Sequence, residues 1–255
     1  MVFCMTGFLL MAYWYEGCQQ ERLNQQLAEL KHGNTEGAMY VEAEPLTSVK
    51  EAEQEQAAEK PQVQAAGTQD NQQKTEQGLS EINADYVMWL QIYHTEIDYP
   101  VVQRDNSYYL EHNFFGEKSR HGTIFLDEGC KAEGRFLLLH GHHMKDGTMF
   151  GSLKNYKKAD FREQHRELGL EWEEKEETYE IFSGALIDLL EAGRFCYEEL
   201  PESEEDIKAY LQQLKEVAFW YEEPQWKEGE RFVVLSTCDY GTKEQRLIVV
   251  AVEKK

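Results

Sequence analysis

The sequence predicts a mainly β fold with added helices for residues 82–255. Two observations support this fold class. Short apolar runs return at close intervals and are separated by polar residues, which is typical of an antiparallel barrel or sandwich. A single amphipathic segment interrupts them, whereas an α/β fold would alternate strands with helices throughout. The runs cover residues 88–92, 101–103, 123–126, 135–140, 178–190, 231–237 and 246–252.

Residues 1–18 form a hydrophobic N-terminal segment. The first fifteen residues, MVFCMTGFLLMAYWY, carry no charge, and Glu16 ends the run. A membrane span needs about 20 apolar residues, and a secretory signal peptide normally starts with basic ones. We interpret the segment as a truncated signal-anchor whose basic start lies upstream of Met1. A cleaved signal peptide and a segment that packs on the domain remain the alternatives.

Residues 19–81 are predicted to form a helix followed by a spacer. Leu23, Leu27 and Leu30 lie on one helical stripe, and Gly33 can end the helix. Residues 51–80 then contain eight Gln, five Glu and five Ala. Such a segment buries too little apolar surface to offset its ordering entropy, so we expect a disordered spacer, with a marginal helix as the alternative. The ordered domain would then begin near residue 82.

The amphipathic segment covers residues 202–220 and is predicted to be a helix. Its apolar residues follow the i, i+3, i+4, i+7 spacing of one helical face. Ser203 and Asp206 resemble a capping pair at its start. The members of the stripe are Ile207, Tyr210, Leu211, Leu214 and Val217.

The charge and the cysteines exclude several classes of protein. The chain has 26 Lys and Arg against 48 Asp and Glu, a net charge of −22, which repels the phosphates of nucleic acids. The five cysteines are an odd number without a C-x-x-C pair, which argues against a disulfide framework and a zinc ribbon. At least one free thiol is therefore expected.

Two segments contain the residues best suited to chemistry. The first, FLLLHGHHMKDGTMF at 136–150, is an apolar strand that ends in three histidines. The second, FVVLSTCDYGTKEQRLIVV at 232–250, places Cys238 at the end of a strand and Arg246 at the start of the next. An arginine stabilises a thiolate or an oxyanion, and a nearby histidine completes an acid–base pair. From the pattern alone, a small buried cysteine and a metal-binding histidine cluster (His140, His142, His143) stay open.

From about residue 82 onward the chain resembles the class B sortases, cysteine transpeptidases of the Gram-positive cell surface. The resemblance covers about two thirds of the chain in family order. It rests on NADYVMWLQIYHTEIDYPVVQRDNSYYLEHNFFGE at 83–117, HGTIFLD at 121–127, LLLHGHHMKDGTMFGSL at 137–153, and LSTCDY followed by RLIVVA.

The resemblance implies a set of site residues. The catalytic residues fall on His142, Cys238 and Arg246, while Ser236, Thr237 and Tyr240 are candidate substrate-binding residues. The alternative that Ser236 is an ordinary strand or turn residue, without a role in the site, stays open. The sequence departs from the family pattern twice, because a Tyr and an Asn of the usual motif are replaced by His140 and His143. We expect these extra imidazoles to affect the pKa of His142.

The resemblance also implies a fold and an activity. The expected fold is an eight-stranded barrel with N-terminal helices and a helix between strands six and seven, and this helix falls on residues 202–220 as one wall of the substrate groove. The expected reaction cleaves a sorting motif such as N-P-x-T-x after Thr and transfers the protein to an amine of peptidoglycan or a pilin. We expect no cofactor and no metal, a surface protein as substrate, and an extracellular domain on an N-terminal membrane anchor. The alternatives are a peptidase that hydrolyses the same peptides and a non-catalytic module that binds peptide or metal.

Overall fold

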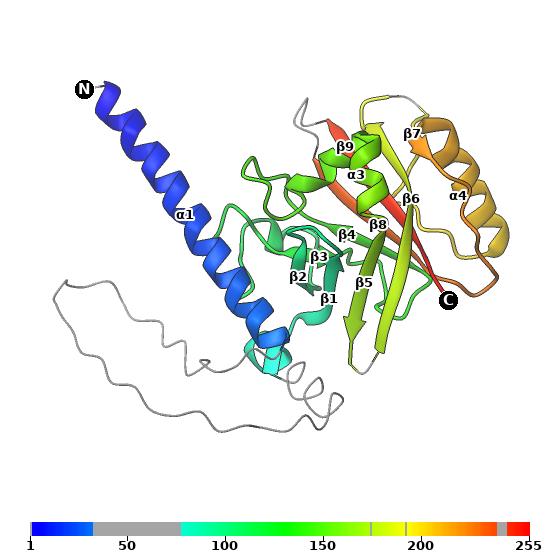
Figure 1. The fold of residues 1–255 in the computed structure, drawn as a ribbon, viewed down its shortest axis with the longest axis horizontal. Coiled ribbons are helices and arrows are strands. Elements are labelled where there is room, and N and C mark those ends of the chain that lie inside the picture. Colours follow the sequence, from blue (N-terminus) through cyan, green and yellow to red (C-terminus); the bar gives the residue numbers. More distant parts are fainter. Residues whose placement is uncertain (1, 33–77, 174, 192, 239–243) are drawn as a thin grey trace.

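The computed structural model describes residues 2–32, 78–173, 175–191, 193–238 and 244–255 (Figure 1). Within these ranges the main feature is a sheet that closes on itself. Its strands are β1 (Tyr86–Ile92), β2 (Asp98–Val102), β3 (Ile124–Leu126), β4 (Phe136–His140), β5 (Glu167–Trp172), β6 (Lys175–Asp188), β7 (Ala218–Tyr221), β8 (Phe232–Cys238) and β9 (Gln245–Glu253).

The sheet forms a closed barrel of eight strands. Its order is β5-β1-β2-β3-β4-β8-β9-β6, and the pairing of β5 with β6 closes the ring, while β7 pairs with β6 outside it. This confirms the mainly β fold and the eight-stranded barrel. The β2–β3 and β4–β8 pairs are parallel, so the barrel is mixed rather than antiparallel throughout. A parallel pair needs a long crossover, and the chain from β4 to β8 supplies one through β5, β6 and β7.

Seven of the strands lie on the predicted apolar runs, but β5 and β7 were missed. In β5 the sequence ELGLEW contains two glutamates and Gly169, which weaken a strand pattern. A Cβ at Gly169 would lie 2.7 Å from the Tyr93 hydroxyl, so the glycine allows a close approach that the local sequence does not reveal. In β7 the apolar residues continue the stripe of the preceding helix, which led to a prediction of helix up to residue 220.

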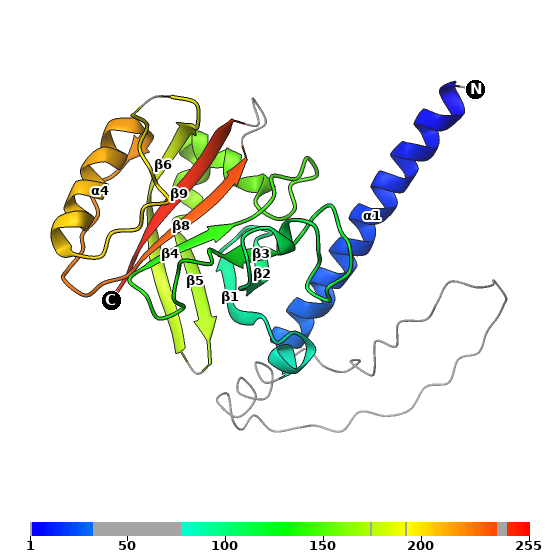
Figure 2. The same cartoon turned by 180° about the vertical axis from the view of Figure 1, so that it is seen from behind.

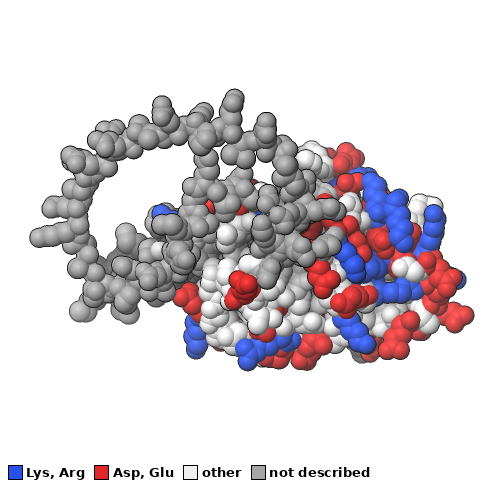
Figure 3. Space-filling view, turned by 90° about the horizontal axis from the view of Figure 1, so that it is seen from below, with Lys and Arg blue, Asp and Glu red and all other residues white. Residues whose placement is uncertain are grey.

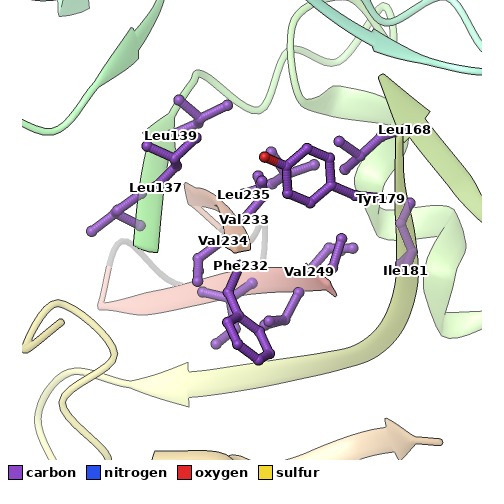
Figure 4. Packing of buried hydrophobic residues seen from close by; sticks show 14 of the residues in the cluster. Leu137, Leu139, Leu168, Tyr179, Ile181, Phe232, Val233, Val234, Leu235 and Val249 are labelled. Atoms are coloured by element: carbon purple, nitrogen blue, oxygen red, sulfur yellow. The ribbon is translucent and has the colours of Figure 1, made fainter. Parts of the chain in front are cut away.

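Side chains alternate between the inside and the outside of the barrel. Leu137 and Leu139 of β4, Val233 and Leu235 of β8 and Tyr179 of β6 are fully buried and belong to one apolar cluster, part of which Figure 4 shows. On the outside, the Phe136 ring stacks on that of Phe232 at 4.8 Å. The outer face of β4 and β8 is therefore apolar too, and it needs a cover.

Helix α4 (Glu204–Val217) supplies that cover. Its capping box is present: the Asp206 backbone N–H donates to Ser203 Oγ at 3.1 Å, and the Ser203 N–H donates to the Asp206 carboxylate at 3.1 Å. Tyr210 lies edge-on to Phe136 at 5.2 Å, and Leu214 is fully buried. The predicted helix is thus confirmed, ending at Val217, because Ala218 begins β7.

Helix α1 (Val2–Lys31) lies on the other side of the barrel from α4, as Figures 1 and 2 show. Leu27 is 1% exposed and packs in a second apolar cluster with Trp89. Lys31 forms an ion pair with Glu171 at 2.7 Å, and the Ser119 hydroxyl donates to Gln20 Oε1 at 3.1 Å. The C-terminal half of α1 is therefore packed on the domain.

Two predictions concern the segments around this helix. Among the described residues, no helix combines the length and the apolar content needed to cross a bilayer. The predicted spacer falls mainly on residues 33–77, which lie outside the described residues; the next described residues form a short helix at 78–82.

The remaining helices are short: η1 (Tyr108–Leu110), η2 (Gly151–Lys157) and α3 (Ala159–Gln164). Basic and acidic side chains are interspersed over the part of the domain surface that Figure 3 shows uncovered. The excess of acidic residues is therefore not gathered into one patch on that face.

Candidate active site

The strand register brings the three predicted catalytic residues to one edge of the barrel. Cys238 is the last residue of β8 and pairs with Arg246 of the antiparallel strand β9. On the other side β4 runs parallel to β8, with His140 opposite Ser236 and the Gly141 N–H donating to the Ser236 carbonyl at 3.1 Å. His142 follows His140 by two residues, as Cys238 follows Ser236. Because parallel strands end at the same edge of a sheet, His142 and Cys238 lie there together, with Arg246 on the third strand.

The His142 ring is held by the backbone of η1. Its Nε2 lies 2.7 Å from the carbonyl oxygen of Leu110. A carbonyl can only accept, so Nε2 carries the hydrogen and Nδ1 is the nitrogen available for acid–base chemistry. Gly122 lies against the same edge of the ring, since a Cβ there would be 3.3 Å from His142 Cδ2, the carbon bonded to Nε2. The ring is half-buried, as an acid–base group that must meet a substrate should be.

Hydrogen bonds hold the loop after His142 in place. The Phe150 N–H donates to the His142 carbonyl at 2.9 Å. Asp146 accepts hydrogen bonds from the Thr148 N–H at 3.0 Å and from its hydroxyl at 2.7 Å, and lies 3.4 Å from Nε2 of the buried His121. Burial opposes the ionisation of Asp146, but the hydrogen bonds from Thr148 and His121 outweigh it and lower the pKa of this carboxyl.

The other two histidines of the cluster, His140 and His143, do not form a metal site with His142. The His140 Nε2 lies 3.0 Å from the Asp127 carboxylate, and this hydrogen bond holds the pKa of Asp127 below its usual value. His143 forms a backbone bridge with Met149. Within the described ranges, no group of three or more His, Cys, Asp or Glu side chains is arranged to hold a metal ion.

Three further cysteines have described side chains, and none of them stands at the end of a barrel strand. Cys130 is buried, which raises the pKa of its thiol to about 11, so it stays protonated at neutral pH. Cys18 lies on α1 and Cys196 in the β6–α4 connection, both half-buried and both free thiols.

The predicted substrate-binding residues occupy different surroundings. Ser236 and Thr237 are each 2% exposed. Thr237 follows the alternation of β8 into the barrel, and among the described residues its hydroxyl has no hydrogen-bond partner. Tyr240 lies outside the described residues. Between α4 and the β6–α4 connection is a cavity of about 350 Å³, lined among others by Cys196, Tyr210 and Gln213 but by none of the three predicted catalytic residues.

Sequence reasoning missed three residues that touch the site. Leu110 contributes a backbone carbonyl, which no sequence motif reveals. Asp127 ends the quoted HGTIFLD segment, and His140 ends the neighbouring strand. Their contact could therefore have been proposed from the sequence. Tyr197 receives a hydrogen bond from Ser236 at 3.0 Å across 39 residues of sequence, and the sequence offers no signal for that contact.

The comparisons agree with this geometry. The sortase domain model matches residues 90–254. Sortase B of Listeria monocytogenes is 37% identical over 166 residues, which cover 63% of this chain and 65% of the relative, just under two thirds of its length.

Two solved structures are similar as well. Sortase B of Clostridium perfringens is 33% identical with a TM-score of 0.63, covering 71% of this chain and all of that one. A Staphylococcus aureus sortase B–substrate complex is 28% identical with a TM-score of 0.64, covering 72% of this chain and 86% of that one. The chain belongs to the sortase family, and within it to class B.

Proposed function

We propose that this protein is a cysteine transpeptidase that cleaves a sorting motif after Thr and transfers the cleaved protein to an amine. The observation that carries the proposal is the convergence of His142, Cys238 and Arg246 at one barrel edge through the register of β4, β8 and β9. Membership of the sortase family supports the same chemistry.

The reaction has two halves. The Cys238 thiolate attacks the Thr carbonyl carbon, Arg246 stabilises the oxyanion, and the His142 imidazolium gives its Nδ1 proton to the departing amine as the C–N bond breaks. A thioester remains on Cys238. The incoming amine then attacks this thioester, His142 takes up a proton from it, and the thiolate leaves as the new amide bond forms.

The experiment uses the full chain and a pentapeptide library of the form N-P-x-T-x. Mass spectrometry should find a thioester on the tryptic peptide that contains Cys238, and Cys238→Ala should abolish it. Added amine should give a ligated product. A product that is only the free acid would favour the hydrolase, and a biological activity retained by Cys238→Ala would favour a binding module.

The substrate and acceptor follow from the same chemistry. We expect a surface protein with a C-terminal sorting motif as donor, and an amine of a peptidoglycan precursor or of a pilin as acceptor. The complex of the Staphylococcus aureus relative with a substrate supports a peptide donor. Ser236, Thr237 and Tyr240 are proposed to shape the peptide site, with α4 as a wall of the groove. Exchange of α4 for that of another class B enzyme should alter peptide preference.

Sortases are associated with the cell surface. We expect the same of this protein, with an N-terminal membrane anchor and an extracellular catalytic domain. The uncharged residues 1–15 support this expectation. Fractionation of cells that express the protein from its native gene tests it: the protein should sediment with membranes and be cleaved by protease added to intact protoplasts.

A further inference from the structure

A buried histidine outside the predicted catalytic residues contacts the loop that follows His142. His121 lies between η1 and β3 and is 2% exposed. Its Nε2 is 3.4 Å from the carboxylate of Asp146, which belongs to the loop that begins at His142. This pair therefore joins the loop of His142 to the segment of residues 119–123.

Three segments of the chain meet around the His142 ring. The first is η1, which contacts Nε2 through a backbone carbonyl. The second is segment 119–123, which reaches the ring at Gly122, where a Cβ would be 3.3 Å from Cδ2. The Thr123 N–H of this segment donates to the Tyr109 carbonyl of η1 at 2.9 Å. The third is the loop of the histidine itself, and the buried pair joins it to the second.

The two oxygens of the Asp146 carboxylate have different partners. Oδ1 accepts from the N–H and the hydroxyl of Thr148 within the same loop, whereas Oδ2 faces His121. Burial alone would raise the pKa of this carboxyl, but the hydrogen bonds lower it, so at neutral pH it can only accept. Nε2 of His121 is therefore the donor, and its Nδ1 has no partner among the described residues.

Helix α1 covers one side of this pair. The His121 N–H donates to Ser119 Oγ at 3.2 Å, and the Ser119 hydroxyl donates to Gln20 of α1 at 3.1 Å. Gln20 is itself buried. The helix also passes close to Asp146, because a Cβ at Gly17 would be 3.7 Å from its Oδ2. Contacts with α1 on one side and with the loop on the other restrict the imidazole of His121.

We propose that His121 and Asp146 form a positioning pair for His142. This proposal rests on the proposed function, in which His142 gives and takes up a proton at Nδ1. With the pair in place, segment 119–123 is held by both η1 and the loop, and the ring between them keeps Nε2 on its carbonyl. Without the pair, the segment and the loop separate, and the ring leaves the orientation that proton transfer requires.

The kinetic test compares two substitutions of His121 in the full chain. His121→Leu keeps a buried side chain but removes the donor, whereas His121→Gln keeps an N–H group that can reach Asp146. We expect His121→Leu to lower kcat for N-P-x-T-x peptides about tenfold, because proton transfer is sensitive to small displacements. KM should change less than about twofold, because the pair orients His142 and does not bind the peptide. His121→Gln should stay within about threefold of the wild type in both constants.

A change of the acceptor tests the same contact from the other side. Asp146→Asn keeps an oxygen for Thr148 but places an NH₂ group opposite the Nε2–H of His121. We expect a loss of kcat similar to that of His121→Leu, and less than a further twofold, roughly, when both changes are combined. Losses that multiply, or equal losses for His121→Leu and His121→Gln, would overturn the proposal.

A second readout, on His142 itself, does not need catalysis. Long-range ¹H–¹⁵N correlation spectra of the neutral ring should show the Nε2–H form in the wild type and in His121→Gln. We expect His121→Leu to show a mixture of both tautomers, because the ring is no longer held on its carbonyl. A general loss of stability would not change the tautomer in the folded protein. A spectrum of His121→Leu like that of the wild type contradicts the proposal.

His32→Leu is the matched control. It removes another histidine–aspartate contact, in which Nε2 lies 3.0 Å from the Asp98 carboxylate and α1 is tied to β2 rather than to the loop of His142. It should leave kcat and the His142 spectrum as in the wild type. A loss as large as that of His121→Leu would show that looser packing of α1 is sufficient, and would overturn the proposal. If His121→Leu does not fold, Asp146→Asn gives the same two measurements with the same expected changes.

The two proposals fail in distinguishable ways. A wild-type protein that forms no thioester with any peptide refutes the proposed function. The spectra still decide whether the pair of His121 and Asp146 positions the His142 ring.

Discussion

The carbonyl oxygen of Leu110 lies 2.7 Å from Nε2 of His142. In many hydrolases a carboxylate orients the catalytic histidine and stabilises its charge. Here a backbone carbonyl of η1, which carries no formal charge, orients the ring. It fixes the hydrogen on Nε2 and leaves Nδ1 for the proton transfer that we propose.

The first prediction concerns the tautomer of His142. Above the pH at which the ring loses its charge, long-range ¹H–¹⁵N correlation spectra should show the Nε2–H form. His112 is an internal control, because its Nδ1 donates to the Tyr108 carbonyl at 2.8 Å and should give the opposite pattern. A neutral His142 with its hydrogen on Nδ1 would contradict the contact with Leu110.

The second prediction compares two glycines with positive φ. Gly122 has φ +60° and Gly116 has φ +77°, so alanine causes a similar backbone strain at each position, about 1–2 kcal/mol. Only at position 122 would the new Cβ also clash with the backbone, at 2.3 Å from the Tyr109 carbonyl oxygen, and press on the site, at 3.1 Å from the Leu110 carbonyl oxygen and 3.3 Å from His142 Cδ2.

We therefore expect Gly122→Ala to lower kcat/KM at least tenfold and to lose more stability than Gly116→Ala, which should keep kcat/KM within twofold. Peptide cleavage and thermal unfolding of both variants check this. Equal kinetic losses in the two variants would show that backbone strain, and not the position of His142, causes the effect.

The sequence predicted the parts of this site that depend on single strands. Cys238 and Arg246 could be proposed together because a strand, a turn and a second strand form one continuous segment. The contacts of His142 with Leu110 and Gly122, and of Ser236 with Tyr197, join residues 20 to 39 positions apart. They depend on how loops pack over the barrel edge, and composition and periodicity carry no information about that packing.

The third prediction concerns the charge at position 246. Loss of an oxyanion donor typically costs two to three orders of magnitude in kcat, so Arg246→Ala should lose about 10²–10³-fold. Arg246→Lys should recover only part of this, because an ammonium lacks the planar fork of the guanidinium. Arg166→Lys is the matched control: this arginine is exposed and paired with Glu222 at 2.9 Å, and it should leave kcat unchanged. An active Arg246→Ala variant would remove the arginine from the mechanism.

The fourth prediction concerns pH and Asp127. The hydrogen bond from His140 holds the pKa of Asp127 below its usual value of 3.8. A lowered folded pKa stabilises the protein above the unfolded value, and this stabilisation is lost as the pH falls through the lowered folded value.

Asp127→Asn should therefore reduce the free energy of unfolding by about 1–3 kcal/mol at pH 6, with the difference from the wild type shrinking below pH 4. Urea unfolding between pH 3 and pH 7 measures it, with the exposed Glu163→Gln as control. A difference that stays constant across this range would mean that the carboxylate charge is not responsible.

The last prediction concerns the attachment of α4. Leu214 is fully buried between α4 and the barrel, whereas Val217, one turn further along the same stripe, is 40% exposed. Truncation of a buried leucine costs about 2–5 kcal/mol because it leaves a cavity, and truncation at an exposed position costs about 0.5 kcal/mol or less. Leu214→Ala should therefore lower the midpoint of thermal unfolding clearly, and Val217→Ala should barely change it. If both variants unfold at the wild-type temperature, α4 contributes little to the stability of the barrel.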